Sequence, residues 1–384
     1  GHTRTLSLSD ACRATGKKIL FVLFLFFIVF AMDTLTPTQA RKGHGAASNR
    51  TGRFEAQERV HFDDGWEGDG VAPPPLRTTV GIDSARKAIA YNDSPDVPFD
   101  RSINPYRGCE HGCIYCFARP THAYYGLSPG LDFETRLFQK PDAPERLAKE
   151  LRKPSYKPAF IALGANTDPY QPIERNLLIT RRILQVLADF RHPYAIVTKS
   201  PLVIRDIDLI GPMAEAELAT VSISVTTLDR VLARQLEPRA PTPAKRLAAI
   251  RTLSETGIPT CVLAAPIIPA LNDCELESIL ATAKEAGARY AEYTLLRLPL
   301  EIRDLFIEWL QAHYPDRAQH VMTLVRDTRG GADYDSTWGQ RRTGTGIYAD
   351  MLQKRFLLAR RKLGMDRRTP TLDASQFRPP PAKG

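Results

Sequence analysis

The sequence predicts an α/β fold built on a parallel β-sheet of about six strands, and two observations support this prediction. Between residues 99 and 300, short apolar runs rich in β-branched residues alternate with amphipathic stretches. Strands of a parallel sheet are buried on both faces, so they read as continuous apolar runs separated by helices. Five such alternations follow a cysteine-rich stretch at 104–120, and one further strand is expected before it.

Five runs read as the strands that follow the cysteine-rich stretch: 159–163, 194–198, 219–227, 260–268 and 290–296. The clearest helix between them opens at Thr242 and Pro243, because Thr is a good helix cap and Pro is favoured in the first turn. Gly257 ends this helix. The next helix is expected to begin at Asn272 and to end near Gly287. Together these elements are predicted to form one core domain.

The chain is predicted to be helical after this core and mostly irregular before it. Residues 301–365 form an expected C-terminal extension, with two helices over 301–331 and a third over 347–363. Residues 366–384 are expected to be disordered, since they offer little apolar surface to bury. Residues 32–98 are rich in Gly, Pro, Arg and Asp and show little periodicity, so they are expected to be mostly irregular.

The positive charge of the chain is concentrated near its C-terminal end. The formal net charge is +9, and residues 339–384 alone carry 11 Lys and Arg against 3 Asp and Glu. Several of these cations lie off the apolar stripe of the helix expected over 347–363. A basic helix of this kind indicates an anionic partner such as nucleic acid, although a solvated helix face explains the pattern equally well.

Cysteine usage separates one cluster from three scattered residues. Cys109, Cys113 and Cys116 lie within eight residues, which suggests a metal site in a chain of this size. Six cysteines in 384 residues are too few for a disulfide scaffold. The other three read as small buried apolar residues: Cys12, Cys261 and Cys274.

The spacing of the cluster leaves two kinds of metal site open. A structural zinc ion usually has four protein ligands, and no second cysteine pair exists here. His111 or His122 could complete a site of three cysteines and one histidine. Alternatively, three thiolates suit a 4Fe–4S cluster in which one iron has no protein ligand. An open iron can bind a substrate or cofactor, whereas a closed zinc site only stabilises the fold.

The motif Cys-x3-Cys-x-aromatic-Cys, with Tyr115 as its aromatic residue, resembles the signature of the radical S-adenosylmethionine (SAM) superfamily. Three stretches are similar to the group of radical SAM proteins related to spore photoproduct lyase: INPYRGCEHGCIYCFARPTHAYYG, GANTDPYQPIE and LEPRAPTPAKRLAAI. The resemblance covers roughly residues 99–300 and extends more weakly to 365. It implies a partial (β/α)6, TIM-like barrel in which the cysteine loop follows the first strand.

The same resemblance implies the cofactors and the chemistry. Cys109, Cys113 and Cys116 would ligate a 4Fe–4S cluster, and SAM would be cleaved by one electron to methionine and a 5′-deoxyadenosyl radical. The radical would then take a hydrogen atom from a substrate that the sequence does not identify. A reductant such as flavodoxin or ferredoxin would supply the electron.

Residues that would bind SAM are assigned by the same resemblance. Tyr115 would pack near the adenine. The usual Gly-Gly-Glu after the second strand is absent, and GANTDP stands in its place. Asn166, Thr167 and Asp168 are therefore candidates to accept hydrogen bonds from the methionine amino group. The same residues also read as a turn and helix cap.

Three further candidates lie later in the chain: Lys199 at the end of the third strand, Ser224 in the fourth strand, and Arg239 after the fourth strand. Lys199 and Ser224 lie where the related lyase holds the SAM carboxylate, although a lysine at a strand end often only reaches solvent. Arg239 would hold the carboxylate or ribose side of SAM. Its alternative role is a salt bridge with Glu237 or Asp229.

An apolar segment near the N-terminus conflicts with these expectations. Residues 19–32 are apolar and follow two lysines, a pattern that is too short for an ordinary membrane span and typical of a signal peptide. Iron–sulfur clusters are normally assembled in a reducing cytoplasm. We therefore expect residues 1–31 to come from an over-extended reading frame, the protein to start at Met32 and to be cytoplasmic, and no stable membrane partner.

The sequence leaves three functions to compare. The first is a radical SAM enzyme with an unidentified substrate. The second is a lyase-like enzyme that repairs DNA photoproducts; it would need a thiol that returns a hydrogen atom, for which Cys261 and Cys274 are weak candidates. The third is a zinc-stabilised nucleic-acid-binding protein without enzymatic activity. The strand–helix alternation and the GANTDPYQPIE motif count against the third, since such a module needs neither.

Overall fold

The computed structural model describes residues 41–57, 76–367 and 369–381. These ranges leave out Cys12, the apolar run at 19–32 and residues 58–75. Within the described ranges, no helix has both the length and the apolar character needed to cross a membrane.

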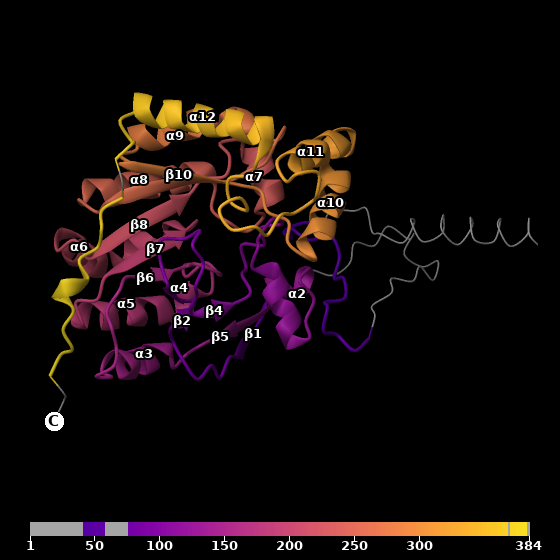
Figure 1. Cartoon of the computed structure of the whole chain (residues 1–384). Helices are drawn as coiled ribbons and strands as arrows, with labels where there is room; N and C mark the ends of the chain where they lie inside the picture. The colour runs from indigo at the N-terminus through magenta and orange to yellow at the C-terminus, as the bar shows by residue number, and fades with distance from the viewer. Residues whose placement is uncertain (1–40, 58–75, 368, 382–384) are drawn as a thin grey trace, which may run out of the picture.

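A seven-stranded sheet forms the centre of the molecule (Figure 1). Its strand order is β10-β9-β8-β7-β6-β3-β2. The strands are β2 (Ala90–Tyr91), β3 (Arg101–Ile103), β6 (Ile161–Leu163), β7 (Tyr194–Thr198), β8 (Ala219–Ser224), β9 (Thr260–Ile267) and β10 (Tyr290–Leu295). All but β2 pair in parallel, and the edge strand β2 pairs antiparallel with β3. The six parallel strands confirm the predicted fold class, and β10 does not pair with β3, so the barrel is open.

Helices follow the strands and cover the outer side of the sheet. They are α3 (Ala143–Leu151), α4 (Glu174–Leu177), α5 (Ile179–Asp189), α6 (Ile207–Glu215), α7 (Arg230–Leu236), α8 (Pro243–Glu255) and α9 (Leu276–Glu285). In α5, the fully buried Ile179, Ile183 and Leu187 recur every fourth residue and face the sheet. This spacing places them on one side of a helix, which is why the segment packs as a helix outside the strands.

The predicted helix boundaries hold at both ends of α8, whereas the start of α9 differs from the prediction. Thr242 precedes α8 with an extended backbone, and Gly257 follows it with a φ of 80°. Asn272, however, does not cap α9. Its side chain accepts a hydrogen bond from the Ile268 amide at 2.6 Å and donates to the Thr226 carbonyl at 2.7 Å, so it fixes the loop after β9. A 3₁₀ turn then precedes α9.

A second, three-stranded sheet was not anticipated. It consists of β1 (Thr79–Ile82), β5 (Arg136–Gln139) and β4 (Tyr106–Arg107), with β5 in the middle. Together with α2 (Leu131–Thr135) and the 3₁₀ helix η1 (Arg119–Tyr125) it lies beside the barrel. The rest of the described residues before β3 is mostly irregular, and β1 is four residues long and exposed, which leaves no apolar pattern to detect.

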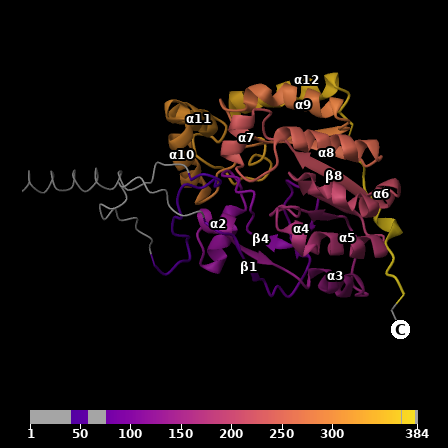
Figure 2. The same ribbon diagram turned by 180° about the vertical axis from the view of Figure 1, so that it is seen from behind.

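The C-terminal extension contains three helices, as predicted. They are α10 (Ile302–His313), α11 (Pro315–Asp327) and α12 (Gly346–Lys362). Both views place α12 along α9 (Figures 1 and 2), where Arg355 pairs with Glu277 at 2.7 Å. Lys354, Arg361 and Lys362 remain exposed. Binding of nucleic acid by this basic helix stays a prediction.

The expectation of a disordered tail is wrong for residues 369–381. The Phe377 ring lies 5.6 Å from Tyr156 and 5.4 Å from His192, between ring centroids. The Arg378 amide donates to the Phe190 carbonyl at 3.0 Å. One aromatic side chain and a few backbone hydrogen bonds therefore anchor a segment whose composition is otherwise polar and proline-rich.

Candidate functional site

The three clustered cysteines lie on one loop that leaves β4 at the C-terminal side of the parallel strands. Two glycines make this loop possible. Gly108 and Gly112 have φ values of 71° and 67°, the left-handed region that favours glycine. A Cβ atom on Gly108 would lie 2.6 Å from the Leu137 side chain, and one on Gly112 would lie 2.8 Å from the Glu134 carboxylate. The motif therefore requires glycine directly before Cys109 and directly before Cys113.

The thiols of the loop are free, buried and close to one another. Cys109 and Cys113 are 7% exposed, and Cys116 is partly buried. Burial raises the pKa of all three thiols; for Cys113 burial and the nearby Glu237 carboxylate raise the pKa to about 12. Such thiols release their protons only to a group that brings positive charge, which is what a bound metal supplies.

Neither histidine that was considered as a fourth ligand joins the thiols. The His111 Nδ1 atom faces the Asp168 carboxylate at 3.4 Å. The His122 Nε2 atom is 2.8 Å from the Arg136 carbonyl, and its ring packs on Phe133. Among the residues that the structure describes, no three His, Cys, Asp or Glu side chains converge as ligands of a single metal ion would. In a 4Fe–4S cluster each thiolate binds a different iron, and the three thiols of the loop are compatible with such a cluster.

A buried ion pair fixes the loop from one side. The fully buried Arg119 donates to the Cys113 carbonyl at 2.8 Å and to the Glu134 carboxylate at 2.5 Å. Glu134 also accepts hydrogen bonds from the amides of Gly45 at 3.1 Å and Ala46 at 2.9 Å. Burial alone would raise the pKa of Glu134, but the Arg119 charge and these donors hold it below its ordinary value. The irregular segment 41–57 is thereby tied to the cysteine loop.

A second set of charged groups lies on the other face of the loop, at the ends of β7 and β8. The Lys199 Nζ atom donates to the Ser224 hydroxyl at 2.6 Å and lies 3.3 Å from the Glu237 carboxylate. It also lies 5.6 Å from the centre of the Tyr115 ring. The Tyr115 hydroxyl bonds to Glu237, and Arg246 pairs with the same carboxylate. Despite complete burial, these cations hold the pKa of Glu237 well below its ordinary value.

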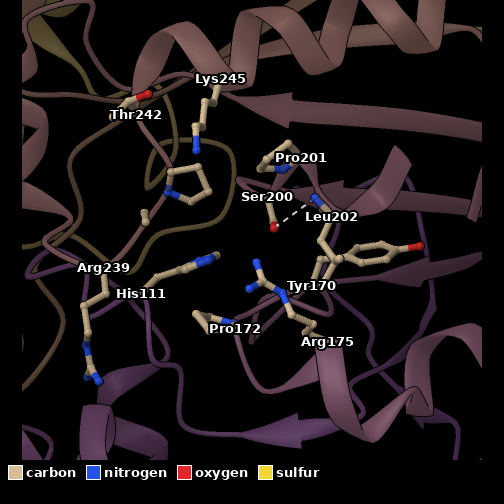
Figure 3. A pocket seen from close by; sticks show the side chains of 12 residues that line it. His111, Tyr170, Pro172, Arg175, Ser200, Pro201, Leu202, Arg239, Thr242 and Lys245 are labelled. Carbon is tan, nitrogen blue, oxygen red and sulfur yellow. Dashed lines mark hydrogen bonds between the residues drawn. The ribbon is translucent and has the colours of Figure 1, made fainter. Parts of the chain in front are cut away.

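A cavity of about 500 Å³ opens next to the loop, where β6, β7 and the segment before α8 end (Figure 3). The His111 imidazole and the Arg175 guanidinium point toward one another across it, whereas the Tyr170 ring points away. Ser200, Pro201 and Leu202 line the opposite wall. The volume lies within the usual range for small-molecule sites. The carboxyl ends of parallel strands are also where barrel enzymes place their chemistry.

Comparisons with known proteins agree with this geometry. A family model described as the radical SAM superfamily matches residues 103–283. An uncharacterized protein of Mycobacterium tuberculosis (strain H37Rv) is 38% identical over 232 residues, which cover 60% of this chain and 68% of the relative. An uncharacterized protein of Methanocaldococcus jannaschii is 32% identical over 215 residues, which cover 56% of this chain and 76% of the relative. The chain belongs to the radical SAM superfamily. This membership implies an enzyme that uses a 4Fe–4S cluster and SAM.

Solved structures support the fold of this radical SAM chain. Spore photoproduct lyase complexed with dinucleoside spore photoproduct superposes with a TM-score of 0.50 and 15% identity, over 74% of this chain and 78% of that chain. A single-residue mutant of the same enzyme gives the same TM-score and identity, over 74% and 79%. At this identity the likeness shows the fold alone.

Asp168, one of the residues expected to bind SAM in this radical SAM chain, is occupied by the protein itself. Its Oδ1 atom accepts hydrogen bonds from the Thr198 hydroxyl at 2.6 Å and the Tyr170 amide at 2.9 Å. Its Oδ2 atom accepts from the Lys199 amide at 2.8 Å and faces His111. Burial opposes its charge, but His111 and these donors lower the pKa of Asp168. Asp168 therefore links the cysteine loop to the end of β7.

Asn166 and Thr167 differ in how available their side chains are. The Thr167 hydroxyl is buried and donates to the Tyr106 carbonyl at 2.8 Å. The Asn166 amide nitrogen of the backbone donates to the Asn104 side chain at 3.0 Å, and within the described residues its own side chain makes no hydrogen bond. Of the three residues in the GANTDP turn, Asn166 keeps a side-chain oxygen for a ligand.

Arg239 lies at the cavity but is turned away from it (Figure 3). It donates to the Glu134 carbonyl at 2.7 Å and to the Thr78 hydroxyl at 3.2 Å. The expected alternative, a salt bridge with Glu237 or Asp229, is wrong. Glu237 pairs with a different arginine, and Asp229 caps α7 through the Val231 amide.

Among the described residues, the two remaining thiols lie outside the cysteine loop. Cys261 is at the start of β9, six residues before Ile267, and strand geometry puts roughly 20 Å between them. Burial raises the pKa of Cys261 to about 12. Cys274 is exposed on the turn before α9. The hydrogen-returning role of Cys261 or Cys274 stays a prediction.

Sequence reasoning missed three residues of the site: Glu134, Glu237 and Arg246. Each is charged and completely or almost completely buried. Nothing in the local sequence marks their pairing, because their side-chain partners lie as many as 122 positions away in the chain. Glu237 and Arg246 both lie within the stretch LEPRAPTPAKRLAAI; Glu237 was considered there as a partner for Arg239, and Arg246 was not singled out.

Proposed function

We propose that this chain binds a 4Fe–4S cluster through Cys109, Cys113 and Cys116 and cleaves SAM reductively to act on a substrate not yet identified. The observation that carries the proposal is a loop at the carboxyl ends of the parallel strands that holds three free thiols, two of them buried and one partly buried. When bound, the cluster supplies the electron that splits SAM into methionine and the 5′-deoxyadenosyl radical. A reductant such as flavodoxin or ferredoxin provides that electron.

We assign the carboxylate of SAM to Lys199 and Ser224. An ammonium group has three donors, and Lys199 uses one on Ser224 and one toward Glu237. One donor therefore remains for a ligand. Asn166, whose side-chain oxygen is unoccupied, is our candidate acceptor for the methionine amino group. Tyr115, held by hydrogen bonds to Thr226 and Glu237, offers its ring next to Lys199.

Arg246 and Glu237 position this group rather than touch the ligand. Arg246 donates to the Ser224 carbonyl at 3.1 Å and to the Pro241 carbonyl at 2.8 Å, in addition to its pair with Glu237. The end of β8 is thus joined to the segment that precedes α8. The charges of Arg246 and Glu237 are both buried. The pair therefore keeps the Lys199 ammonium group oriented, and the Glu237 carboxylate is not exposed to the cavity, where it would compete with the ligand.

The decisive experiment compares Cys113→Ala with Cys261→Ala after anaerobic reconstitution. Wild type and Cys261→Ala should contain about four iron and four sulfide per chain, absorb near ~400 nm as cysteine-ligated clusters do, and form 5′-deoxyadenosine from SAM with dithionite. Cys113→Ala should lose the absorption and the product. Cys261→Ala is a matched control, since it removes a buried thiol of raised pKa far from the loop.

Two results would contradict the proposal. One is a colourless wild-type protein that holds a single zinc ion and no iron. The other is undiminished 5′-deoxyadenosine formation by Cys113→Ala. In either case the loop would be a structural site, and family membership alone would remain.

A further inference from the structure

Four arginines gather at the C-terminal end of β10, on the side of the cysteine loop that faces the C-terminal extension. Arg297 follows β10, Arg329 follows α11, and Arg341 and Arg342 lie in the loop that joins α11 to α12 (Figure 1). Hydrogen bonds fold this loop back onto the strand. The Leu295 amide donates to the Arg342 carbonyl at 2.9 Å, which brings residues distant in the sequence together.

Carboxylates compensate only part of this charge. Arg341 pairs with Asp96, and Arg342 donates to the Asp96 carbonyl at 2.6 Å. The almost completely buried Arg329 donates to two carbonyls, those of Leu296 at 2.6 Å and Gln340 at 3.0 Å. Its Nε atom is buried without a partner. The arginines outnumber the carboxylates that contact them within the described residues.

Arg297 is the least compensated member of the cluster. In the described part of the chain it makes no hydrogen bond and no ion pair, and its guanidinium lies 4.6 Å from the centre of the Phe117 ring. Burial, together with the charges of Arg341, Arg342 and Arg329, lowers the pKa of Arg297 to about 10 against the opposing effect of Tyr334. A partly buried cation without a partner is costly unless a ligand supplies the missing charge.

The position of Arg297 relates this cluster to the proposed catalytic centre. Phe117 directly follows Cys116, and its ring is 45% exposed. Arg297 packs on that ring, so its guanidinium is one aromatic side chain away from the cysteine loop. At the outer side of the cluster, Arg341 lies 4.3 Å from the ring of Trp338, which is also half exposed. Arg297, Arg341 and Arg342 are themselves partly exposed, so a ligand can reach these three arginines from solvent.

We propose that Arg297 and Arg329, supported by Arg341 and Arg342, form an oxyanion subsite that holds a phosphate or carboxylate group of the substrate beside the cysteine loop. Guanidinium groups match the geometry of such anions through paired N–H donors. The Arg297 guanidinium supplies the donors for this purpose, and the almost completely buried Arg329 adds positive charge near it. The subsite rests on the proposed function, since it takes the substrate as its ligand.

The subsite is distinct from the residues assigned to SAM. Lys199 and Ser224 follow β7 and β8, whereas Arg297 follows β10 at the edge of the sheet, two strands beyond β8. An anion that binds at Arg297 should therefore not compete with SAM. This separation gives the experiment an internal check.

The test is an anaerobic calorimetric titration of the reconstituted protein with inorganic phosphate and, separately, with acetate, each against sodium chloride of equal ionic strength. Wild type should show saturable binding of at least one anion, unchanged by saturating SAM. Tighter binding of phosphate would identify a phosphorylated substrate, and tighter binding of acetate a carboxylic acid. Arg297→Gln should weaken the binding about tenfold or more, because hydrogen bonds to charged groups are strong.

Two further variants keep the test specific. Arg297→Lys retains the charge but loses the paired donors, so its affinity should fall between wild type and Arg297→Gln. Arg303→Gln, which removes an equal charge from an exposed ion pair on the neighbouring α10, should bind as wild type does. If Arg297→Gln does not fold, the comparison of Arg297→Lys with Arg303→Gln carries the test.

Three outcomes would overturn the subsite: no saturable binding beyond the chloride control, equal affinities of wild type and the Arg297 variants, or loss of anion binding when SAM is added. None of these depends on reduction or on SAM cleavage. If wild type forms 5′-deoxyadenosine but binds neither anion, the subsite is wrong and the proposed function stands. If it binds an anion but never cleaves SAM, the subsite is a binding site without the proposed chemistry.

Discussion

The arginines on the two sides of the cysteine loop are treated differently by the fold. Next to the second sheet, Arg119 pairs with Glu134. Next to the end of β8, Arg246 pairs with Glu237, and all four side chains are buried. On the side of β10, Arg297 has no carboxylate partner among the described residues. The difference separates two uses of one residue type: a paired arginine completes the fold, and an unpaired one is available to a ligand.

The physical basis of this difference is the cost of a buried charge. Removing one partner of a buried pair leaves the other charge without compensation, which costs about 3–5 kcal/mol. Removing an arginine that has no partner takes away repulsion and the cost of burial instead. Substitutions on the two sides should therefore change the free energy of unfolding in opposite directions, and three of them test this contrast.

The largest effect is expected for Arg119→Met. The change leaves the Glu134 carboxylate, which is fully buried, without its arginine, and it removes donors to four loop carbonyls. The free energy of unfolding, measured anaerobically with denaturant, should fall by about 3–5 kcal/mol. The cluster content should fall with it, because the Arg119 side chain holds the carbonyl of Cys113.

A control for this variant is Arg326→Met, which breaks a partly exposed pair with Asp333. Exposed pairs contribute about 1 kcal/mol or less, so this variant should stay close to wild type. Equal losses in Arg119→Met and Arg326→Met would remove the distinction between buried and exposed pairing on which the comparison rests.

Lys199 stands between the two classes, since it contacts Glu237 and keeps one donor free. Lys199→Met should therefore act mainly on ligand binding. If the proposed function is right, the KM for SAM should rise roughly tenfold to a hundredfold, because a charge-assisted hydrogen bond contributes about 1.5–3 kcal/mol. Iron content should be unchanged, and kcat should fall less than kcat/KM.

Ser224→Ala is the matched variant for this prediction. It removes the hydroxyl that receives the Lys199 donor but leaves the cation, so a smaller rise of KM in the same direction is expected. A normal KM for SAM in both variants would assign the Lys199–Ser224 contact to the fold rather than to the ligand.

The sequence predicted the parts of this molecule that repeat or lie close together in the chain. Continuous apolar runs gave the parallel strands, and the spacing of three cysteines located the loop. The family resemblance assigned Lys199 and Ser224 to the same part of the SAM site, and the structure brings the two side chains into contact. Hydrophobic periodicity and residue spacing are local signals, so they can be read from the sequence without knowledge of the tertiary structure.

The parts that escaped prediction depend on contacts between distant segments. Glu134 accepts hydrogen bonds from the amides of Gly45 and Ala46, which lie 88 or more positions earlier in the chain. These amides belong to a segment that was predicted to be irregular and is irregular in the structure. Phe377 anchors a tail whose composition favours disorder. Arg297 was not singled out, because an unpaired charge can be recognised only when the neighbours that fail to compensate it are known.

The smallest effect, and the one of opposite sign, is expected for Arg297→Gln in the absence of added anions. The variant loses a cation that Arg341, Arg342 and Arg329 repel, and it should be more stable than wild type by up to about 1 kcal/mol, since the side chain is partly exposed to solvent. Phosphate or acetate should then reverse the order: an anion that binds only the folded wild type raises its stability in proportion to the logarithm of the anion concentration, and the variant gains little. Thermal unfolding at several anion concentrations measures both effects. A variant that is less stable than wild type without anions would mean that Arg297 is compensated within the protein after all, and the two sides of the loop would then follow one rule.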